Sequence, residues 1–147
     1  APDLPGPSVL GFIACGAVVR RAAFLEVGGF DVRLGVGGEE ELLSIDLAER
    51  GWGLAYVEEV VAHHHPSPSR DPSGRRRVQV RNALWSTWLR RPLDGAARQT
   101  AHLAALALHQ PGARSGILLA LLGLPWVLRE RHPVHPELEA ALRTLAH

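Results

Sequence analysis

Prolines divide the second half of this chain into short segments, and this restricts it to helices joined by tight breaks. The breaks RPLDG, QPGA and RHPVHP each contain a proline, which cannot continue a helix because it lacks the backbone N–H and its ring clashes with the preceding turn. Between the breaks, the residue pattern predicts helices at about residues 75–90, 96–109, 115–131 and 136–145.

The first half has a mixed pattern. Residues 8–19, SVLGFIACGAVV, read as a β-type run with small residues, and residues 54–57 and 60–64 read as two shorter extended runs. Short helices are expected at about residues 20–27 and from Glu39 to a stop at Gly51. The sequence therefore predicts α/β structure over residues 1–70 and a helical extension over residues 71–147.

Composition excludes some classes of protein and leaves others open. A chain of 147 residues with a net charge of +1 has no global attraction to nucleic acid or to an anionic membrane. The single cysteine, Cys15, excludes an intrachain disulfide, and we expect it to be a small buried side chain. The apolar run at 116–128 is too short to span a membrane, so it is either a core or partner helix or a helix at the membrane surface.

Three glutamates, Glu39, Glu40 and Glu41, directly follow the pair Gly37 and Gly38. Carboxylates in the first turn of a helix are stabilised by the positive end of the helix dipole, so a structural role explains one or two of them. The glycines indicate more, because they free the backbone for a loop that approaches closely beside the acids. Both interpretations stay open on composition alone.

Two further groups of side chains could bind charged ligands. His63, His64 and His65 end the last extended run, and neutral imidazole is a common ligand for Mn²⁺ or Zn²⁺, although this spacing matches no known zinc motif. Arginines crowd the segment RRRVQVRNALW, in which Arg77 and Arg81 share a helix face. Guanidinium groups suit phosphate oxygens, and a solvated basic face is the alternative.

Taken in order, these pieces resemble family 2 glycosyltransferases, which are inverting enzymes of the GT-A type. The matching pieces are RRAAF, the GGFD of Gly28–Asp31, the acidic pair Glu39–Glu40, the GW of Gly51–Trp52, the YV of Tyr56–Val57, the histidine cluster and the RNALW of Arg81–Trp85. The resemblance covers residues 8–90 well and the helical tail only loosely. It implies the C-terminal half of a GT-A domain, which is an α/β fold, followed by the helical extension.

The resemblance also implies roles for individual residues. Glu40 stands where the family has the general base that deprotonates the acceptor hydroxyl, with Glu39 beside it. His64 stands at the metal and diphosphate site, with His63 and His65 as alternatives, and the implied cofactor is Mn²⁺ or Mg²⁺. The remaining implied contacts with substrate come from Gly37, Gly38, Trp52, Arg75, Arg77 and Arg81. Glutamate in place of the usual aspartate, and Leu42 and Asp46 in place of Asp and Arg, depart from the family pattern.

A missing element limits what this chain is expected to do alone. It contains no Asp-x-Asp motif and no initiator Met, so we expect a piece of a longer protein that lacks the nucleotide-binding half and is inactive by itself. The implied partners are a nucleotide-sugar donor and a glycan or lipid-linked acceptor, with no nucleic acid. We expect a cytoplasmic location, peripheral at the inner face of the membrane, and self-association through surface left uncovered.

Two other classes of function compete with the enzyme. In a non-catalytic interaction module, the glutamates would cap a helix and the arginines would contact a partner or lipid surface. In a metal-binding regulatory domain, a second ligand cluster would be needed, and His132 and His135 are its candidates. The enzyme requires Glu40, His64 and Arg77 around one cleft, whereas the module requires no relation among them.

Overall fold

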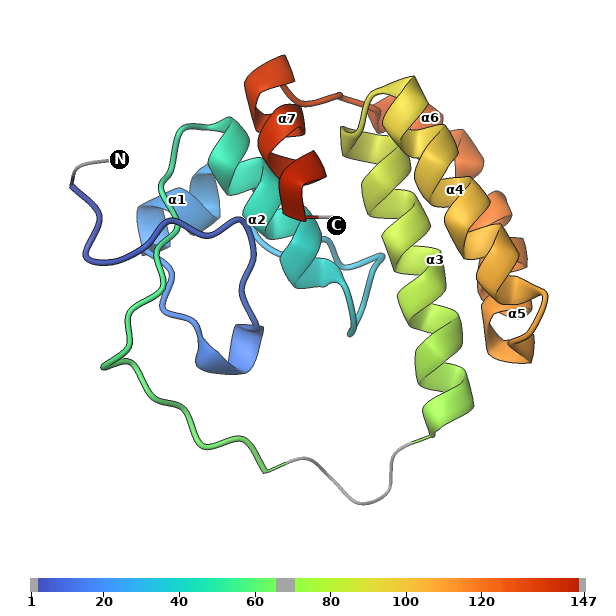
Figure 1. Cartoon of the computed structure of the whole chain (residues 1–147), viewed down its shortest axis with the longest axis horizontal. Helices are drawn as coiled ribbons and strands as arrows, with labels where there is room; N and C mark the ends of the chain where they lie inside the picture. Colours follow the sequence, from blue (N-terminus) through green and yellow to red (C-terminus); the bar gives the residue numbers. More distant parts are fainter. Residues whose placement is uncertain (1–2, 66–70, 146–147) are drawn as a thin grey trace. The chain divides into compact units, whose positions relative to one another are not determined.

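The computed structural model describes residues 3–65 and 71–145, and within these ranges it contains α-helices, one 3₁₀ helix and no strand (Figure 1). The elements are η1 (Ala14–Gly16), α1 (Arg21–Glu26), α2 (Glu39–Glu49), α3 (Pro72–Arg90), α4 (Leu93–Ala107), α5 (Pro111–Leu122), α6 (Leu124–Glu130) and α7 (Pro136–Leu145).

The predicted α/β class is wrong, because the extended runs do not pair into a sheet. The segment at residues 8–19 makes one isolated bridge, between Ser8 and Ala55, and the only regular element inside it is η1. Around that bridge the Val9 amide donates to the Leu54 carbonyl at 3.0 Å and the Tyr56 amide to the Pro7 carbonyl at 2.9 Å. A strand needs a continuous ladder to a neighbour, and among the described residues these runs have none.

The chain divides into two compact units, and each unit combines segments that are distant in sequence. Unit 1 comprises Ala1–Arg33, Glu39–Pro68 and His135–His147, and unit 2 comprises Leu34–Gly38 and Ser69–Val134. Helices α1, α2 and α7 therefore belong to unit 1, and α3 to α6 belong to unit 2. The domain boundary predicted after residue 70 falls at residues 66–70, outside the described part of the chain.

Unit 1 has a core between α1 and α2. Ala23, Leu43 and Leu47 are buried there, and the half-buried aromatic and aliphatic side chains around them are Phe12, Val19, Phe24, Val27, Trp52 and Leu54. The turn after α1 requires glycine at position 29, where φ is +71° and a Cβ would lie 2.7 Å from the Phe24 ring. Phe24 in turn meets Phe30 edge to face at 5.5 Å.

Unit 2 is a helical layer in which α3 packs along both α4 and α5 (Figure 1). Trp85 of α3 lies at its centre and is buried. Its indole N–H donates to the Ala120 carbonyl at 2.9 Å, and its ring meets Trp126 edge to face at 5.2 Å. A Cβ at Gly123 would lie 2.5 Å from the Trp85 Nε1 atom, so this position needs the smallest residue.

The helices of the second half follow the predicted pattern, with one difference of substance. The single helix expected over residues 115–131 is two helices, α5 and α6, because the chain bends at Gly123 and Pro125 stands in the first turn of the next helix. No single described helix is long and apolar enough to cross a membrane, whereas residues Gly112–Leu122 and Leu124–Glu130 meet that test together across a bend of 59°.

Candidate functional site

The acidic helix start forms as a tight turn followed by a helix. Glu39, Glu40 and Glu41 make the first turn of α2. Gly37 and Gly38 precede them with φ values of +108° and +99°, a backbone region that other residues rarely adopt. A Cβ at Gly38 would also lie 3.3 Å from the Asn82 Cβ atom. Both glycines are therefore required by the turn that leads into the acids.

The three glutamates differ in their surroundings. Glu41 is exposed, whereas Glu39 and Glu40 are half-buried. The Glu40 carboxylate accepts a hydrogen bond at 3.4 Å from the backbone amide of Ala14, which lies 26 residues earlier in the chain. A carboxylate at this end of a helix is stabilised by the backbone N–H groups. Glu40 therefore contacts the backbone of a distant segment of unit 1 and keeps part of its surface exposed.

Trp52 has a structural environment within unit 1. Its indole N–H donates to Glu26 Oε2 at 2.9 Å, and its ring packs against the core formed by Ala23, Leu43 and Leu47. Trp52, predicted to contact substrate, therefore uses its indole N–H and much of its ring in contacts within the unit. Only the part of its surface that is still exposed could contact a ligand.

The three histidines lie in an irregular, exposed segment, so the extended run that they were expected to end is not a strand. Within the described ranges, no three His, Cys, Asp or Glu side chains gather closely enough to hold a metal ion. His63, His64 and His65 therefore do not form a prebuilt metal site with other described residues. The same holds for His132 and His135, the second ligand cluster that the regulatory-domain hypothesis needs.

The predicted phosphate-binding arginines have separate environments on α3. Arg75 and Arg77 are exposed. Arg81 is partly buried, its Nε donates to Asn82 Oδ1 at 2.9 Å, and one terminal nitrogen donates to the Leu34 carbonyl at 2.8 Å. Burial, and then the charge of Arg77, lower the pKa of the Arg81 guanidinium. The Arg81 guanidinium is therefore used in hydrogen bonds within the protein, and of the three predicted arginines Arg75 and Arg77 are the exposed ones.

Asn82 is a structurally central residue to which sequence reasoning gave no role of its own. It is fully buried, and its amide nitrogen donates to the carbonyls of Leu34 at 2.9 Å and Gly37 at 2.7 Å. Together with Arg81 it fixes segment 34–38, which is followed by Glu39. The available signal was its spacing, because Asn82 shares a helix face with Trp85 and Leu89, where a polar residue is unexpected.

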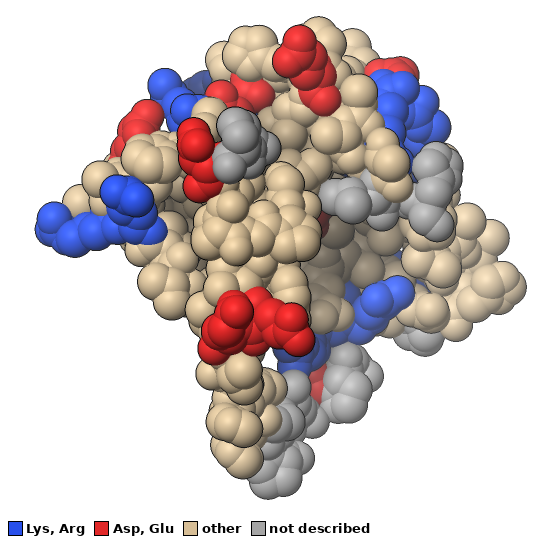
Figure 2. Space-filling model, turned by 60° about the vertical axis from the view of Figure 1, so that its left-hand side comes forward, with Lys and Arg blue, Asp and Glu red and all other residues tan. Residues whose placement is uncertain are grey.

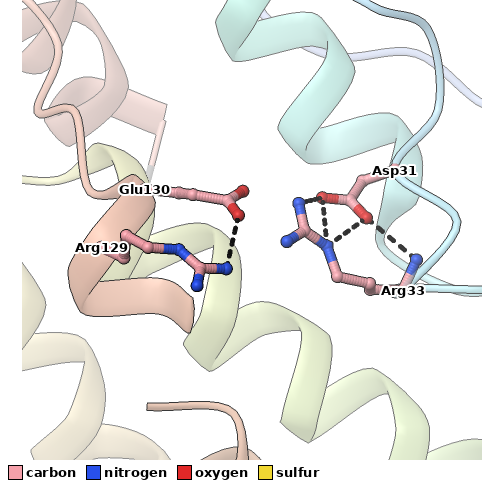
Figure 3. A network of polar contacts seen from close by, with 4 residues as sticks. All are labelled: Asp31, Arg33, Arg129 and Glu130. Atoms are coloured by element: carbon pink, nitrogen blue, oxygen red, sulfur yellow. Dashed lines mark hydrogen bonds and ion pairs between the residues drawn. The ribbon is translucent and has the colours of Figure 1, made fainter. Parts of the chain in front are cut away.

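Asp31, the last residue of the GGFD motif, closes a local turn. Its two carboxylate oxygens accept from the Arg33 guanidinium, at 2.7 Å for the shortest contact, and one of them also accepts from the Arg33 backbone amide at 2.9 Å (Figure 3). The second pair drawn there, Arg129 and Glu130, is a separate contact of 3.5 Å in α6. The Asp31 carboxylate therefore has a structural role, which is to hold the local turn through Arg33.

The predicted site residues divide between the two units. Glu39, Glu40, Trp52 and the three histidines belong to unit 1, whereas Gly37, Gly38 and the three arginines belong to unit 2. Comparison of the chain with protein-family models, with curated proteins and with solved structures finds no match.

Proposed function

We propose that this chain supplies the general base and part of the acceptor side of an inverting, family 2-like glycosyltransferase. The observation that supports it best is Glu40 in the first turn of α2, a half-buried carboxylate that accepts a hydrogen bond at 3.4 Å from the Ala14 amide. It stands directly behind two glycines that no other residue could replace without strain. The order of the motifs along the chain adds to this observation.

The proposed chemistry is a displacement at the anomeric carbon of a nucleotide-diphosphate sugar. Glu40 takes the proton of an acceptor hydroxyl, the acceptor oxygen forms the new bond to the anomeric carbon, and the bond to the nucleoside diphosphate breaks with inversion. Arg75 and Arg77, the exposed members of the arginine group, belong to unit 2, and their contact with the departing phosphates stays a prediction of the sequence resemblance. The proposed step uses no metal ion, because among the described residues no three His, Cys, Asp or Glu side chains lie close enough to hold one.

The chain is proposed to act only together with a nucleotide-binding portion, since its sequence has no Asp-x-Asp motif. The test therefore uses the full protein that its gene encodes. It measures release of nucleoside diphosphate from a panel of sugar nucleotides, with and without Mn²⁺. We expect Glu40→Gln to lower turnover by roughly 10²–10⁴-fold, the usual contribution of a general base.

The matched control is Glu41→Gln, which changes an exposed glutamate in the same helical turn and is expected to leave turnover unchanged. His64→Ala tests the metal assignment by the Mn²⁺ concentration that gives half-maximal activity. Turnover that is indifferent to Glu40→Gln, or that falls equally in Glu41→Gln, would rule out the assigned base.

A second function is favoured by the surface of unit 2. The exposed leucines of α5 and α6 and the exposed arginines of α3 would suit a non-catalytic interaction module. Such a module predicts no turnover with any donor and predicts binding that Glu40→Gln leaves intact.

A further inference from the structure

The outward face of α5 is unusually apolar. Leu118 and Leu122 are 65% and 78% exposed, Leu121 lies beside them, and the exposed Leu128 continues the surface onto α6. No charged residue occurs between Arg114 and Arg129. Solvent-facing sides of helices normally carry charged or polar residues, so these leucines are not explained by contact with water.

Packing within unit 2 does not explain them either, because α5 contacts α3 through its opposite side. That side consists of small buried residues, namely Ala113, Gly116 and Ala120. A Cβ at Gly116 would lie 2.6 Å from the Arg77 carbonyl oxygen, so the two helices approach as closely as their backbones allow. The exposed leucines therefore do not contribute to the packing of α5 on α3.

The charge of unit 2 indicates what covers this surface. The unit contains 11 arginines and 3 acidic residues, which gives it a formal charge of +8. Asp94 lies 3.2 Å from Arg98 and Glu130 lies 3.5 Å from Arg129. Arg114 and Arg129, which flank the apolar run, are both exposed. A second copy that presented the same face of unit 2 would bring like charges together, whereas a surface of anionic phosphates would attract them.

We propose that the apolar face of α5 and α6, defined by Leu118, Leu121, Leu122 and Leu128, binds the surface of an anionic lipid bilayer. The leucines enter the boundary between headgroups and acyl chains, and exposed arginines of the unit, Arg129 among them, contact the lipid phosphates. The 59° bend and the attachment of α5 to α3 favour a helix pair that lies on the bilayer. This inference is independent of the proposed glycosyl transfer.

The test is co-sedimentation of the full 147-residue chain with vesicles. One set is phosphatidylcholine alone, and the other contains about 30% phosphatidylglycerol, at about 0.1 M NaCl, where screening is moderate. We expect binding to the anionic vesicles, weak binding to the neutral ones, and release as the salt rises towards about 1 M.

The decisive variant is Leu118→Gln with Leu122→Gln, because glutamine has similar length and good helix propensity, so the helix is kept. We expect this change to lower the partition coefficient by about tenfold or more. The control is Val32→Gln, an equally drastic change at a residue of unit 1 that is 92% exposed, and it should bind as the original protein does. Circular dichroism verifies that both variants are folded.

Three results would overturn the proposal. The first is an absence of binding to either vesicle, and the second is equal binding by the double variant and the original chain. The third is a sedimentation-velocity experiment in which the original chain is a dimer and the double variant a monomer, since that would assign the leucines to a second copy.

Discussion

Asn82 gives segment 34–38 its fixed conformation through two donor hydrogens. Both are used, on the carbonyls of Leu34 and Gly37, inside a buried environment. Removing the donor of a buried carbonyl lowers the free energy of unfolding by more than an average hydrogen bond contributes. The carbonyl then has neither its protein donor nor water as a partner. The Asn82 side chain is therefore as important to the turn before the acidic residues as the glycines within that turn.

From this we expect Asn82→Leu, which has similar volume and no donor, to lower the free energy of unfolding by about 2–3 kcal/mol. Urea denaturation followed by tryptophan fluorescence measures the change. Arg75→Ala is the control, since an exposed residue on the same helix should alter stability by less than about 0.5 kcal/mol. Equal midpoints for Asn82→Leu and the original chain would contradict the role assigned to the two hydrogen bonds.

Single residues were the least predictable level of this structure. Cys15, expected to be buried, is exposed, because the run around it forms a 3₁₀ turn rather than an inner strand. Arg81 was predicted to contact substrate together with Arg75 and Arg77, yet its guanidinium stacks over the Trp85 ring at 4.4 Å. Burial of one side chain depends on neighbours that are distant in sequence, and local pattern does not contain them.

At the level of elements, the contact between α3 and α5 depends on glycine. Gly116 faces the Arg77 carbonyl and the Val80 side chain, at 2.6 Å and 2.8 Å from an added Cβ. Alanine is the better helix former by about 1 kcal/mol, but the two helices would have to separate to admit its methyl group.

We therefore expect Gly116→Ala to lower the free energy of unfolding by about 1–3 kcal/mol, as overpacking usually does. Leu118→Ala, two residues later and on the outward face, should be nearly neutral. Thermal unfolding by circular dichroism compares the two. A Gly116→Ala protein that is more stable than the original would mean that helix propensity outweighs the close approach.

Helices were predictable from the sequence, and strands were not, for a physical reason. A helix closes its hydrogen bonds within four residues, so the proline breaks and glycine stops fixed α2, α3, α4 and α7 to within a few positions. The runs at residues 8–19 and 60–64 have extended patterns, but pairing depends on a partner elsewhere in the chain. Composition cannot state whether that partner exists, and among the described residues it does not.

On the scale of the whole molecule, unit 1 combines segments from both ends of the chain. Helix α7 belongs to unit 1, although nearly all of unit 2 lies between it and α2 in the sequence. It contributes the buried Leu142 and the buried Glu139, which pairs with Arg143 at 2.7 Å. Just before it, the His135 amide donates to Glu49 of α2 at 3.1 Å.

Removing residues 136–147 should therefore destabilise unit 1 and spare unit 2. Trp52 reports on unit 1, whereas Trp85, Trp88 and Trp126 report on unit 2. In a Trp52→Phe background, the truncation is expected to leave the emission maximum unchanged. Far-UV circular dichroism should lose more helix than α7 itself contains, and a shifted emission maximum would show that unit 2 also needs α7.

The partition of charge has a consequence for the behaviour of the protein in solution. Unit 1 contains 5 arginines and 12 acidic residues, a formal charge of −7 against the +8 of unit 2, although the whole chain has +1. Figure 2 draws the acidic side chains in red and the arginines in blue.

Unlike charges on neighbouring molecules attract each other when little salt is present to screen them. We therefore expect this protein to be salted in: its solubility should be lowest in dilute buffer and rise as NaCl is added to about 0.3 M. Static light scattering would give a negative second virial coefficient at low ionic strength that turns positive with salt. A coefficient that does not change with salt would mean that the protein behaves as an evenly charged colloid.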